Sequence, residues 1–222
     1  MSEPIIKARN LHKYYEIKDG LLHAPQDLKA LSGVSFDLFE GQTLAVVGES
    51  GCGKSTLARL LTSIESPTSG YLSVDGIDMA DSQDKLMSKK LRKTVQMVFQ
   101  DPFGSLNPRQ KVGDIIQEPL LINTELSATE RREKALDIMR LVGLKEEHFH
   151  RYPHMFSGGQ RQRIAIARAL ILKPKVVVLD EPTAVLTPQE TDELLRNMKK
   201  LKANGTSIVF ITHKLREVKE AA

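Results

Sequence analysis

Short apolar runs alternate with amphipathic stretches along most of the chain, a pattern typical of strands that alternate with helices. The run at residues 176–179 is continuously apolar, as expected for a strand that is covered on both faces of a parallel sheet. Runs nearer the start have a half-buried pattern, which predicts an antiparallel β patch. We therefore expect an α/β fold with a mostly parallel sheet. The predicted strands are residues 5–8, 34–38, 43–47, 71–74, 95–99, 176–179 and 207–211.

The stretch between residues 101 and 168 has a different pattern, with no convincing strand and several helical segments. Ser127 followed by Glu130 has the spacing of a capping box, in which each side chain binds the other residue's backbone N–H at the start of a helix. Gly143 is expected to end that helix, because glycine readily adopts the left-handed conformation found after a last turn. We predict a helical subdomain of residues 101–168, inserted into a core formed by residues 1–100 and 169–222.

Composition excludes several classes of protein. The chain has 222 residues, of which 41% are hydrophobic and 27% charged, as in ordinary globular proteins. The 32 Lys and Arg against 28 Asp and Glu leave a net charge of +4, which is too small to indicate a nucleic-acid partner. Cys52 is the single cysteine of the sequence, which excludes an internal disulfide and a cysteine-based zinc site.

Nothing in the sequence predicts direct insertion into a membrane. No window approaches the roughly 18 consecutive apolar residues of a membrane-spanning helix. Residues 1–4 lack the basic stretch and apolar core of a secretory signal. We expect a cytoplasmic protein that meets a membrane through a partner.

A glycine-rich segment directly follows the predicted strand 43–47. Residues 48–55 have the order glycine, four residues, glycine, lysine and serine, and they open a segment with helical spacing. In this context the glycines let successive backbone N–H groups surround an anion, and the helix N-terminus adds positive potential. Lys54 is expected to reach the β- and γ-phosphates of a nucleotide, and the Ser55 hydroxyl to bind magnesium. The predicted nucleotide-binding residues are Gly48, Glu49, Ser50, Gly51, Cys52, Gly53, Lys54, Ser55 and Thr56.

Two acidic residues follow the apolar run at 176–179. Successive residues of a strand point to opposite faces, so Asp180 and Glu181 can share a site only if the chain turns, which Pro182 favours. An acid at the end of a buried strand is where a phosphate-loop fold places its magnesium ligand. We predict that Asp180 holds magnesium and that Glu181 polarises the attacking water.

A serine-glycine-glycine-glutamine segment stands shortly before the acidic strand and resembles the signature motif of ABC-type ATPases. Gln100 matches the Q-loop glutamine of that family, and His213 matches its switch histidine. Tyr15 matches the aromatic residue that stacks on adenine, with Tyr14 as an alternative. These elements stand in the order of the family and cover nearly the whole chain. The signature residues are Ser157, Gly158, Gly159 and Gln160.

The resemblance implies a P-loop ATPase that works as a head-to-tail dimer with two ATP molecules at the interface. Each signature segment, at a helix N-terminus, would bind the γ-phosphate of the nucleotide held by the other subunit. Glu181 would act as the base, and Gln100 and His213 would sense the γ-phosphate beside Lys54. The two ATPase subunits of such a dimer can be identical or different. The residues implied to hold Mg²⁺ are Ser55, Gln100 and Asp180.

Two segments indicate a subfamily. Residues 99–109, around the Q-loop, and residues 151–157 are similar to those in the ATPase subunits of bacterial dipeptide and oligopeptide importers. In that family the Q-loop and the helical subdomain contact permease subunits in the membrane. The resemblance therefore implies a peptide-importer ATPase that binds ATP and Mg²⁺ and lies peripherally on the cytoplasmic face of the membrane.

After Pro182 the sequence departs from that subfamily. Residues 184–190 and 208–218 resemble ATPases of sugar and nucleoside importers instead, and the family normally continues beyond residue 222 with further strands. A chimera of two subfamilies joined near residues 175–183, by engineering or recombination, would explain both features, and a natural hybrid with a shortened end is the alternative.

Two other functions compete with transport. Soluble ABC ATPases of chromosome maintenance or repair carry long coiled-coil arms between the Q-loop and the signature, whereas the segment in this chain is short and lacks sustained heptads. A nucleotide-binding module with little turnover is the second alternative. It would follow if the unusual segment after Pro182 kept the dimer from closing.

Overall fold

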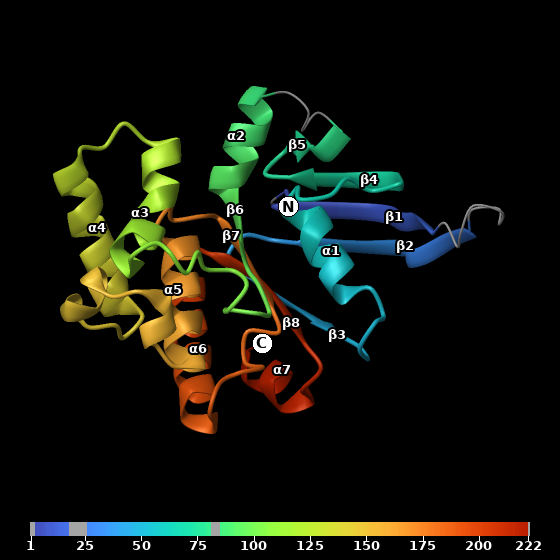
Figure 1. Cartoon of the computed structure of the whole chain (residues 1–222). Coiled ribbons are helices and arrows are strands. Elements are labelled where there is room, and N and C mark those ends of the chain that lie inside the picture. Colours follow the sequence, from blue (N-terminus) through green and yellow to red (C-terminus); the bar gives the residue numbers. More distant parts are fainter. Residues whose placement is uncertain (1–2, 18–25, 81–84, 222) are drawn as a thin grey trace.

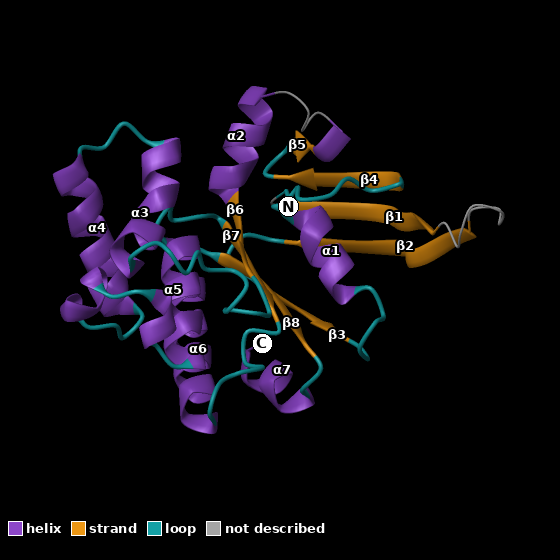
Figure 2. Ribbon diagram, in the orientation of Figure 1, coloured by secondary structure: helices purple, strands orange, loops and turns teal. Residues whose placement is uncertain are grey.

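The computed structural model describes residues 3–17, 26–80 and 85–221, so that Met1 and Ser2 of the N-terminal segment lie outside it. Within these ranges the strands form two four-stranded sheets with helices packed around them (Figure 1, Figure 2). The strands are β1 (Ile6–Ile17), β2 (Gln26–Leu38), β3 (Thr43–Val47), β4 (Ser69–Val74), β5 (Ile77–Asp78), β6 (Val95–Val98), β7 (Val176–Asp180) and β8 (Ser207–Thr212). The helices are α1 (Lys54–Leu61), α2 (Lys85–Thr94), α3 (Val112–Asn123), α4 (Ala128–Leu141), η2 (Glu146–His150), η3 (Pro153–Met155), α5 (Gly158–Leu170), α6 (Pro188–Ala203) and α7 (Leu215–Ala221).

The first sheet is parallel and has the strand order β3-β8-β7-β6. Every residue of β7 and β8 is buried, because helices cover both faces of the sheet at its centre. This burial explains why their sequences read as continuous apolar runs. The predicted mostly parallel sheet is confirmed, and its strands begin and end within about two residues of the predicted bounds.

The second sheet is antiparallel and has the order β2-β1-β4-β5. It confirms the predicted antiparallel patch, but β1 and β2 are much longer than predicted. Their outer halves pair with shifts of register and are largely exposed, so they lack the strict apolar alternation that marks a strand. Helix α1 lies between the two sheets, and Leu57, Leu60 and Leu61 pack into an apolar cluster shared by both (Figure 1).

Strand β5 and helix α2 are among the elements that the sequence analysis did not predict. Strand β5 has two residues, which is too short to show any periodicity. Helix α2 is rich in lysine and arginine, and it buries Leu91 and Thr94 but leaves Leu86 exposed. A pattern based on buried apolar residues therefore gives little signal for either element.

Helices α3, α4 and α5 gather on the side of the parallel sheet away from the antiparallel sheet (Figure 2). The predicted capping box at Ser127 and Glu130 is present. Helix α4 ends at Leu141, two residues before Gly143, which has φ of +76°. The described residues between 101 and 168 contain no strand, as predicted. The division into core and subdomain stays a prediction, since one apolar cluster joins these helices to β7 and β8. No helix in the described ranges combines the length and the apolar character needed to cross a membrane.

Candidate functional site

Four of the predicted site residues follow neighbouring strands of the parallel sheet. Because these strands are parallel, their carboxyl ends lie at the same edge. Lys54 comes after β3 and His213 after β8. Glu181 comes after β7 and Gln100 after β6. A crevice outside the carboxyl ends of parallel strands is the usual ligand site of open α/β sheets, and this topology brings together residues that are far apart in the sequence.

The loop between β3 and α1 has the backbone that its glycines predict. Gly51 and Gly53 have φ of +81° and +94°, a region that residues with a Cβ rarely adopt. A Cβ at Gly53 would also overlap the backbone carbonyl oxygen of Ala30 in β2. Glycine at position 53 therefore lets the loop pack directly on β2 at the point where α1 begins.

Lys54 places a buried positive charge inside this loop. Its side chain is 6% exposed, and its Nζ donates to the carbonyl oxygens of Gly48 at 2.9 Å and Glu49 at 2.7 Å. The same Nζ lies 3.8 Å from Oε1 of Glu181. An ammonium group held by carbonyl oxygens can exchange them for the more strongly binding oxygens of an anion. The position is thus suited to the phosphate-binding role predicted for Lys54.

A cavity of about 620 Å³ opens over the phosphate loop. This volume is typical of small-molecule sites. The cavity gathers residues from β1, β2, the phosphate loop, α1 and the ends of β6, β7 and β8. Gly48, Cys52 and Asp180, although predicted as site residues, do not belong to its lining. The lining residues are Tyr15, Leu28, Lys29, Ala30, Glu49, Ser50, Gly51, Gly53, Lys54, Ser55, Thr56, Gln100, Glu181 and His213.

The two candidate tyrosines on β1 have different surroundings. Tyr15 lines the cavity, and its hydroxyl donates a hydrogen bond to Glu65. Burial, followed by this bond, raises the pKa of Tyr15 above its ordinary value. Tyr14 instead places its hydroxyl 2.9 Å from Nδ1 of His12. The geometry favours Tyr15 over Tyr14 for contact with a base, and its stacking role stays a prediction.

Asp180 is a buried carboxyl group at the end of β7. The residue is 4% exposed, and this burial raises the pKa of the carboxyl above its ordinary value even though a hydrogen bond from Ser55 lowers it. Oδ1 of Asp180 has no hydrogen-bond partner among the described residues. A buried carboxylate oxygen without a partner, beside a serine hydroxyl, offers the hard oxygen ligands that Mg²⁺ prefers.

At Glu181 the chain turns out of β7, and this residue has φ of +43°. This is the turn that Asp180 and Glu181 were predicted to need in order to share one site. Its Oε2 accepts a hydrogen bond from Nε2 of Gln100 at 3.2 Å and lies 3.2 Å from Nδ1 of His213. With Lys54 at 3.8 Å from Oε1, the structure brings the other three predicted catalytic side chains to the carboxylate of Glu181. Their catalytic roles are not tested by this geometry and stay predictions.

The signature residues lie apart from this cavity, at the N-terminus of α5. Ser157 accepts a hydrogen bond from the backbone N–H of Gln160, and the Gln160 side chain accepts one from the backbone N–H of Ser157. A Cβ at Gly159 would overlap the carboxylate of Glu190, which lies at the start of α6. Within one chain, then, none of the four signature residues lines the cavity over the phosphate loop.

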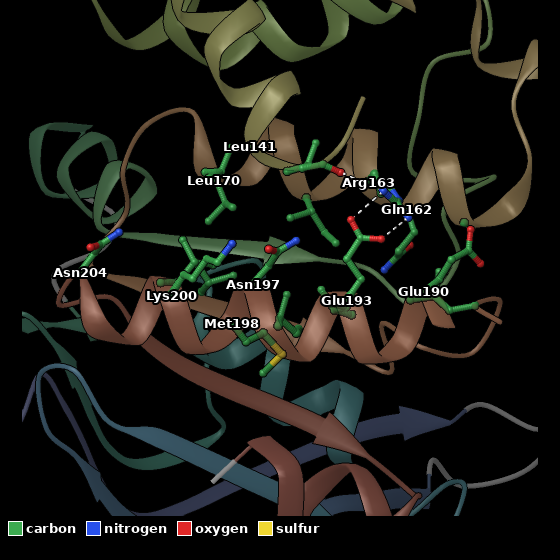
Figure 3. Close-up of a pocket in the computed structure, with 18 residues that line it drawn as sticks. Leu141, Gln162, Arg163, Leu170, Glu190, Glu193, Asn197, Met198, Lys200 and Asn204 are labelled. Carbon is green, nitrogen blue, oxygen red and sulfur yellow. Dashed lines mark hydrogen bonds and ion pairs between the residues drawn. The ribbon is translucent and has the colours of Figure 1, made fainter. Parts of the chain in front are cut away.

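A second cavity lies between α5 and α6 (Figure 3). Its walls are mostly apolar, with Leu170 and Met198 on facing helices, and Arg163 at its edge forms an ion pair of 2.8 Å with Glu193. Among its lining residues Gly159 is the one predicted site residue. The residues that line it include no glycine-rich loop, so the cavity over Lys54 remains the predicted site for phosphate binding.

Sequence reasoning missed two parts of the site. Residues 28–30 of β2 form one wall of the cavity, yet the strand was predicted to begin only at residue 34. Glu65, which holds the Tyr15 hydroxyl, lies in the segment after α1 and belongs to no motif. Glycine at position 53 indicates that another part of the chain packs closely against the loop, but the sequence does not show that this part is Ala30 of β2.

Comparison with known proteins places the whole chain among ATP-binding subunits of transporters. Residues 31–184 match the family described as ABC transporter. The chain is 55% identical over 221 residues to a di/tripeptide transport ATP-binding protein of Pseudomonas aeruginosa, covering 99% of this chain and 68% of the relative. It is also 55% identical over 223 residues to the dipeptide transport ATP-binding protein of Escherichia coli, covering 100% of this chain and 66% of the relative. The chain thus spans about two thirds of the length of these relatives.

Solved structures agree with the fold. The dimeric post-hydrolysis state of the ATP-binding cassette MJ0796, bound to ADP and phosphate, has a TM-score of 0.88 at 30% identity, covering 97% of this chain and 90% of that one. A second dimeric structure of that bacterial cassette has a TM-score of 0.87. The similarity confirms the predicted P-loop ATPase fold. The alignments with the dipeptide relatives run through residues 175–183, so they give no support to a junction of two subfamilies there.

Replacing Lys54 with alanine should weaken ATP binding about 10- to 100-fold, since a hydrogen bond to a charged group contributes about 1.5–3 kcal/mol. Equilibrium titration with a fluorescent ATP analogue measures the change. Lys134→Ala, an exposed lysine on α4, is the control and should bind as the parent does. Unchanged affinity in Lys54→Ala would contradict the phosphate-loop assignment.

Replacing Asp180 with asparagine should raise the thermal unfolding temperature at pH 7. The folded-state pKa of Asp180 is raised, so its contribution to stability is complete below the unfolded pKa of about 3.9 and is lost as the pH rises through the folded value. Asparagine removes that loss. The unfolding temperatures of Asp180→Asn and the parent should therefore diverge as the pH rises from 4 to 7.

The control is Asp37→Asn, on the exposed side of β2. Its hydrogen bond with Arg9 lowers the pKa of Asp37, so the charged Asp37 carboxylate stabilises the folded chain at pH 7. Asparagine removes that stabilisation, whereas at position 180 it removes a destabilisation. Asp37→Asn should leave the unfolding temperature at pH 7 unchanged or slightly lower. If Asp180→Asn behaves in the same way as Asp37→Asn, then burial does not destabilise the Asp180 carboxylate.

Proposed function

The chain belongs to the ABC transporter family of ATP-binding proteins, and from this membership we propose that it is the ATP-hydrolysing subunit of a dipeptide or oligopeptide importer. In the proposed assembly two such subunits pair head to tail with two ATP molecules between them. The observation that carries the proposal is the convergence of Lys54, Gln100 and His213 on Glu181 at the edge of the phosphate-loop cavity.

ATP would bind with its phosphates along the loop and its base toward β1. Successive backbone N–H groups of residues 48–56 would hold the phosphates, with the N-terminus of α1 adding positive potential. Lys54 would exchange its carbonyl partners for oxygens of the β- and γ-phosphates. The ring of Tyr15, fixed by its bond to Glu65, would support the adenine.

The residues near Asp180 fit a magnesium ion. The unpaired Oδ1 of Asp180, the Ser55 hydroxyl next to it and the amide of Gln100 would hold the ion together with phosphate oxygens. Bound magnesium supplies positive charge that offsets the charge of the phosphates. It would also remove the cost of the buried carboxylate, since Asp180 would gain the partner it lacks.

Glu181 would accept a proton from the attacking water. Its Oε2 already lies within hydrogen-bonding distance of Gln100 and His213, so a water between these groups would be oriented toward the γ-phosphate. His213 would bind the γ-phosphate and Lys54 would stabilise its charge. Gln100, Glu181 and His213 follow three different strands and Lys54 begins α1, so hydrolysis would require this edge of the sheet to be intact.

The signature residues would complete the site of a second subunit. Ser157 to Gln160 lie apart from the cavity of their own chain, and the similar cassettes of known structure are described as dimeric. The helix N-terminus at Ser157 and its glycines would bind the γ-phosphate held by the partner. Subunits of this kind can pair with an identical or a related copy.

The permease would contact the helical side of the molecule. Phe103, after the Q-loop, is 53% exposed and lies under the guanidinium of Arg161, and Met155 is 59% exposed. Exposed apolar side chains on one lobe are typical of a contact surface. The relatives' names describe dipeptide transport, which supports a peptide importer with this subunit peripheral on the cytoplasmic face of the membrane.

Glu181→Gln should lower the ATP hydrolysis rate about 100- to 10,000-fold, because the amide keeps the shape but cannot act as a base. ATP binding should persist, since the substitution removes a negative charge near the γ-phosphate. The variant should therefore accumulate as an ATP-bound dimer, visible as a larger species in size-exclusion chromatography with MgATP. Asp180→Asn should not show this shift, because magnesium placement fails first.

A second substitution tests the composite site. Adding Ser157→Arg to Glu181→Gln should abolish the dimer, because arginine would crowd the partner's nucleotide. Ser127→Arg, at the matching capping box of α4, is the control and should leave the dimer intact. Normal ATP turnover in Glu181→Gln would show that Glu181 is not the base. Lost turnover in a variant that stays monomeric would favour a nucleotide-binding module.

A further inference from the structure

Glu217 is a buried carboxylate on α7 that the proposed hydrolysis reaction does not use. The residue is 4% exposed, and each of its oxygens accepts a hydrogen bond from a buried threonine. The Thr183 hydroxyl donates to Oε1 at 2.7 Å, and the Thr212 hydroxyl donates to Oε2 at 2.8 Å. Nζ of Lys214 lies 3.2 Å from Oε1 and balances the charge.

The two threonines belong to the segments that carry the site. Thr183 lies two residues after Glu181, and Thr212 ends β8 immediately before His213. Lys214 adds to the connection, since its Nζ also lies 3.3 Å from the carbonyl oxygen of Thr183 and its backbone N–H donates to the Thr212 hydroxyl at 3.1 Å. One carboxylate therefore joins the chain that follows Glu181 to the chain on both sides of His213.

The energetics favour a rigid unit. A carboxylate taken out of water is costly unless it is paired and hydrogen-bonded, and both oxygens of Glu217 are satisfied. Hydrogen bonds to a charged acceptor are about twice as strong as neutral ones, and a fully satisfied buried network fixes its members in one arrangement. Removal of Glu217 would leave the hydroxyls of Thr183 and Thr212 buried without this acceptor.

Glu181 needs such support from its surroundings. Its φ of +43° is an unfavourable conformation for a residue with a side chain, and such residues persist only where neighbouring structure holds them. Its backbone N–H donates to the carbonyl oxygen of Ile211 at 2.9 Å, directly before Thr212. The hydrogen bonds that Thr183 and Thr212 donate to Glu217 hold the two segments that meet at this contact.

We propose that Glu217 is a positioning residue for hydrolysis, which holds the turn at Glu181 and the switch residue His213 in register with each other. This inference rests on the proposed function for the role of those two residues, although not for the network itself.

The test uses two variants, Glu217→Ala and Glu217→Gln. The control is Glu220→Gln, which replaces another glutamate of α7 by glutamine at a residue that binds exposed Arg216. In Glu217→Ala the kcat for ATP should fall about 10- to 100-fold, the effect expected when catalytic groups shift by about 1 Å. ATP affinity and KM should stay within about twofold of the parent, as expected for a change confined to the transition state. Glu217→Gln, which can still bind one hydroxyl, should recover part of the loss.

A second measurement does not depend on turnover. The Cε1 resonance of His213, assigned by its absence in His213→Ala, should shift in Glu217→Ala and stay at the parental position in Glu220→Gln. Thr212→Val removes a single hydroxyl from the network, so it tests the proposal even if Glu217→Ala fails to fold. It should lower kcat about tenfold and shift the His213 resonance in the same way as Glu217→Ala.

The outcomes separate the proposed function from the positioning role. A parent that does not hydrolyse ATP would overturn the proposed function, while the His213 resonance would still decide whether Glu217 positions that residue. Parental kcat and an unmoved His213 resonance in Glu217→Gln and Thr212→Val would overturn the positioning role. A rise in KM that accounts for the whole effect would also overturn it.

Discussion

Glu181 has to leave a fully buried strand and turn at once, so that its carboxylate faces the same crevice as Gln100, His213 and Lys54, which follow three other strands. Its positive φ is the local cost of that turn, and the contacts with Gln100 and His213 are what the turn achieves. The parallel sheet makes the meeting possible, because its strand order places the carboxyl ends of β6, β7 and β8 side by side. A change in that order would separate the groups without altering any motif.

The site concentrates charge in places where burial disfavours it. Lys54 and Asp180 are both buried, and Oδ1 of Asp180 has no partner among the described residues. Such groups reduce the stability of the folded chain, yet they suit a site that binds a polyanion and a cation together. Binding of Mg²⁺ would supply the partner that Oδ1 of Asp180 lacks, and ATP would offer Lys54 phosphate oxygens in place of its carbonyl partners. Stability and function would then be linked through these two residues.

Much of the fold followed from periodicity, because buried strands such as β7 and β8 read as continuous apolar runs and the capping box of α4 has a local signature. The phosphate loop was equally local, since a tight loop before a helix needs glycine at Gly51 and Gly53. The wall formed by β2 and the bond from Tyr15 to Glu65 depend on tertiary packing, and no spacing in the sequence encodes them. The roles of Gln100 and His213 came from resemblance, whereas their meeting at Glu181 came from the sheet.

The separation of the signature segment from the cavity leads to the central claim, which is that ATP hydrolysis needs two chains. Ser157 belongs to α5 and lies apart from the phosphate-loop cavity, so a single chain would lack one side of the γ-phosphate site. The most direct measurement is the rate of ATP hydrolysis per chain at saturating MgATP over a series of chain concentrations that begins where light scattering finds monomers. If two chains are needed, the rate per chain rises with concentration and then levels off as dimers form. A rate per chain that stays constant from the monomeric range upward would contradict the claim.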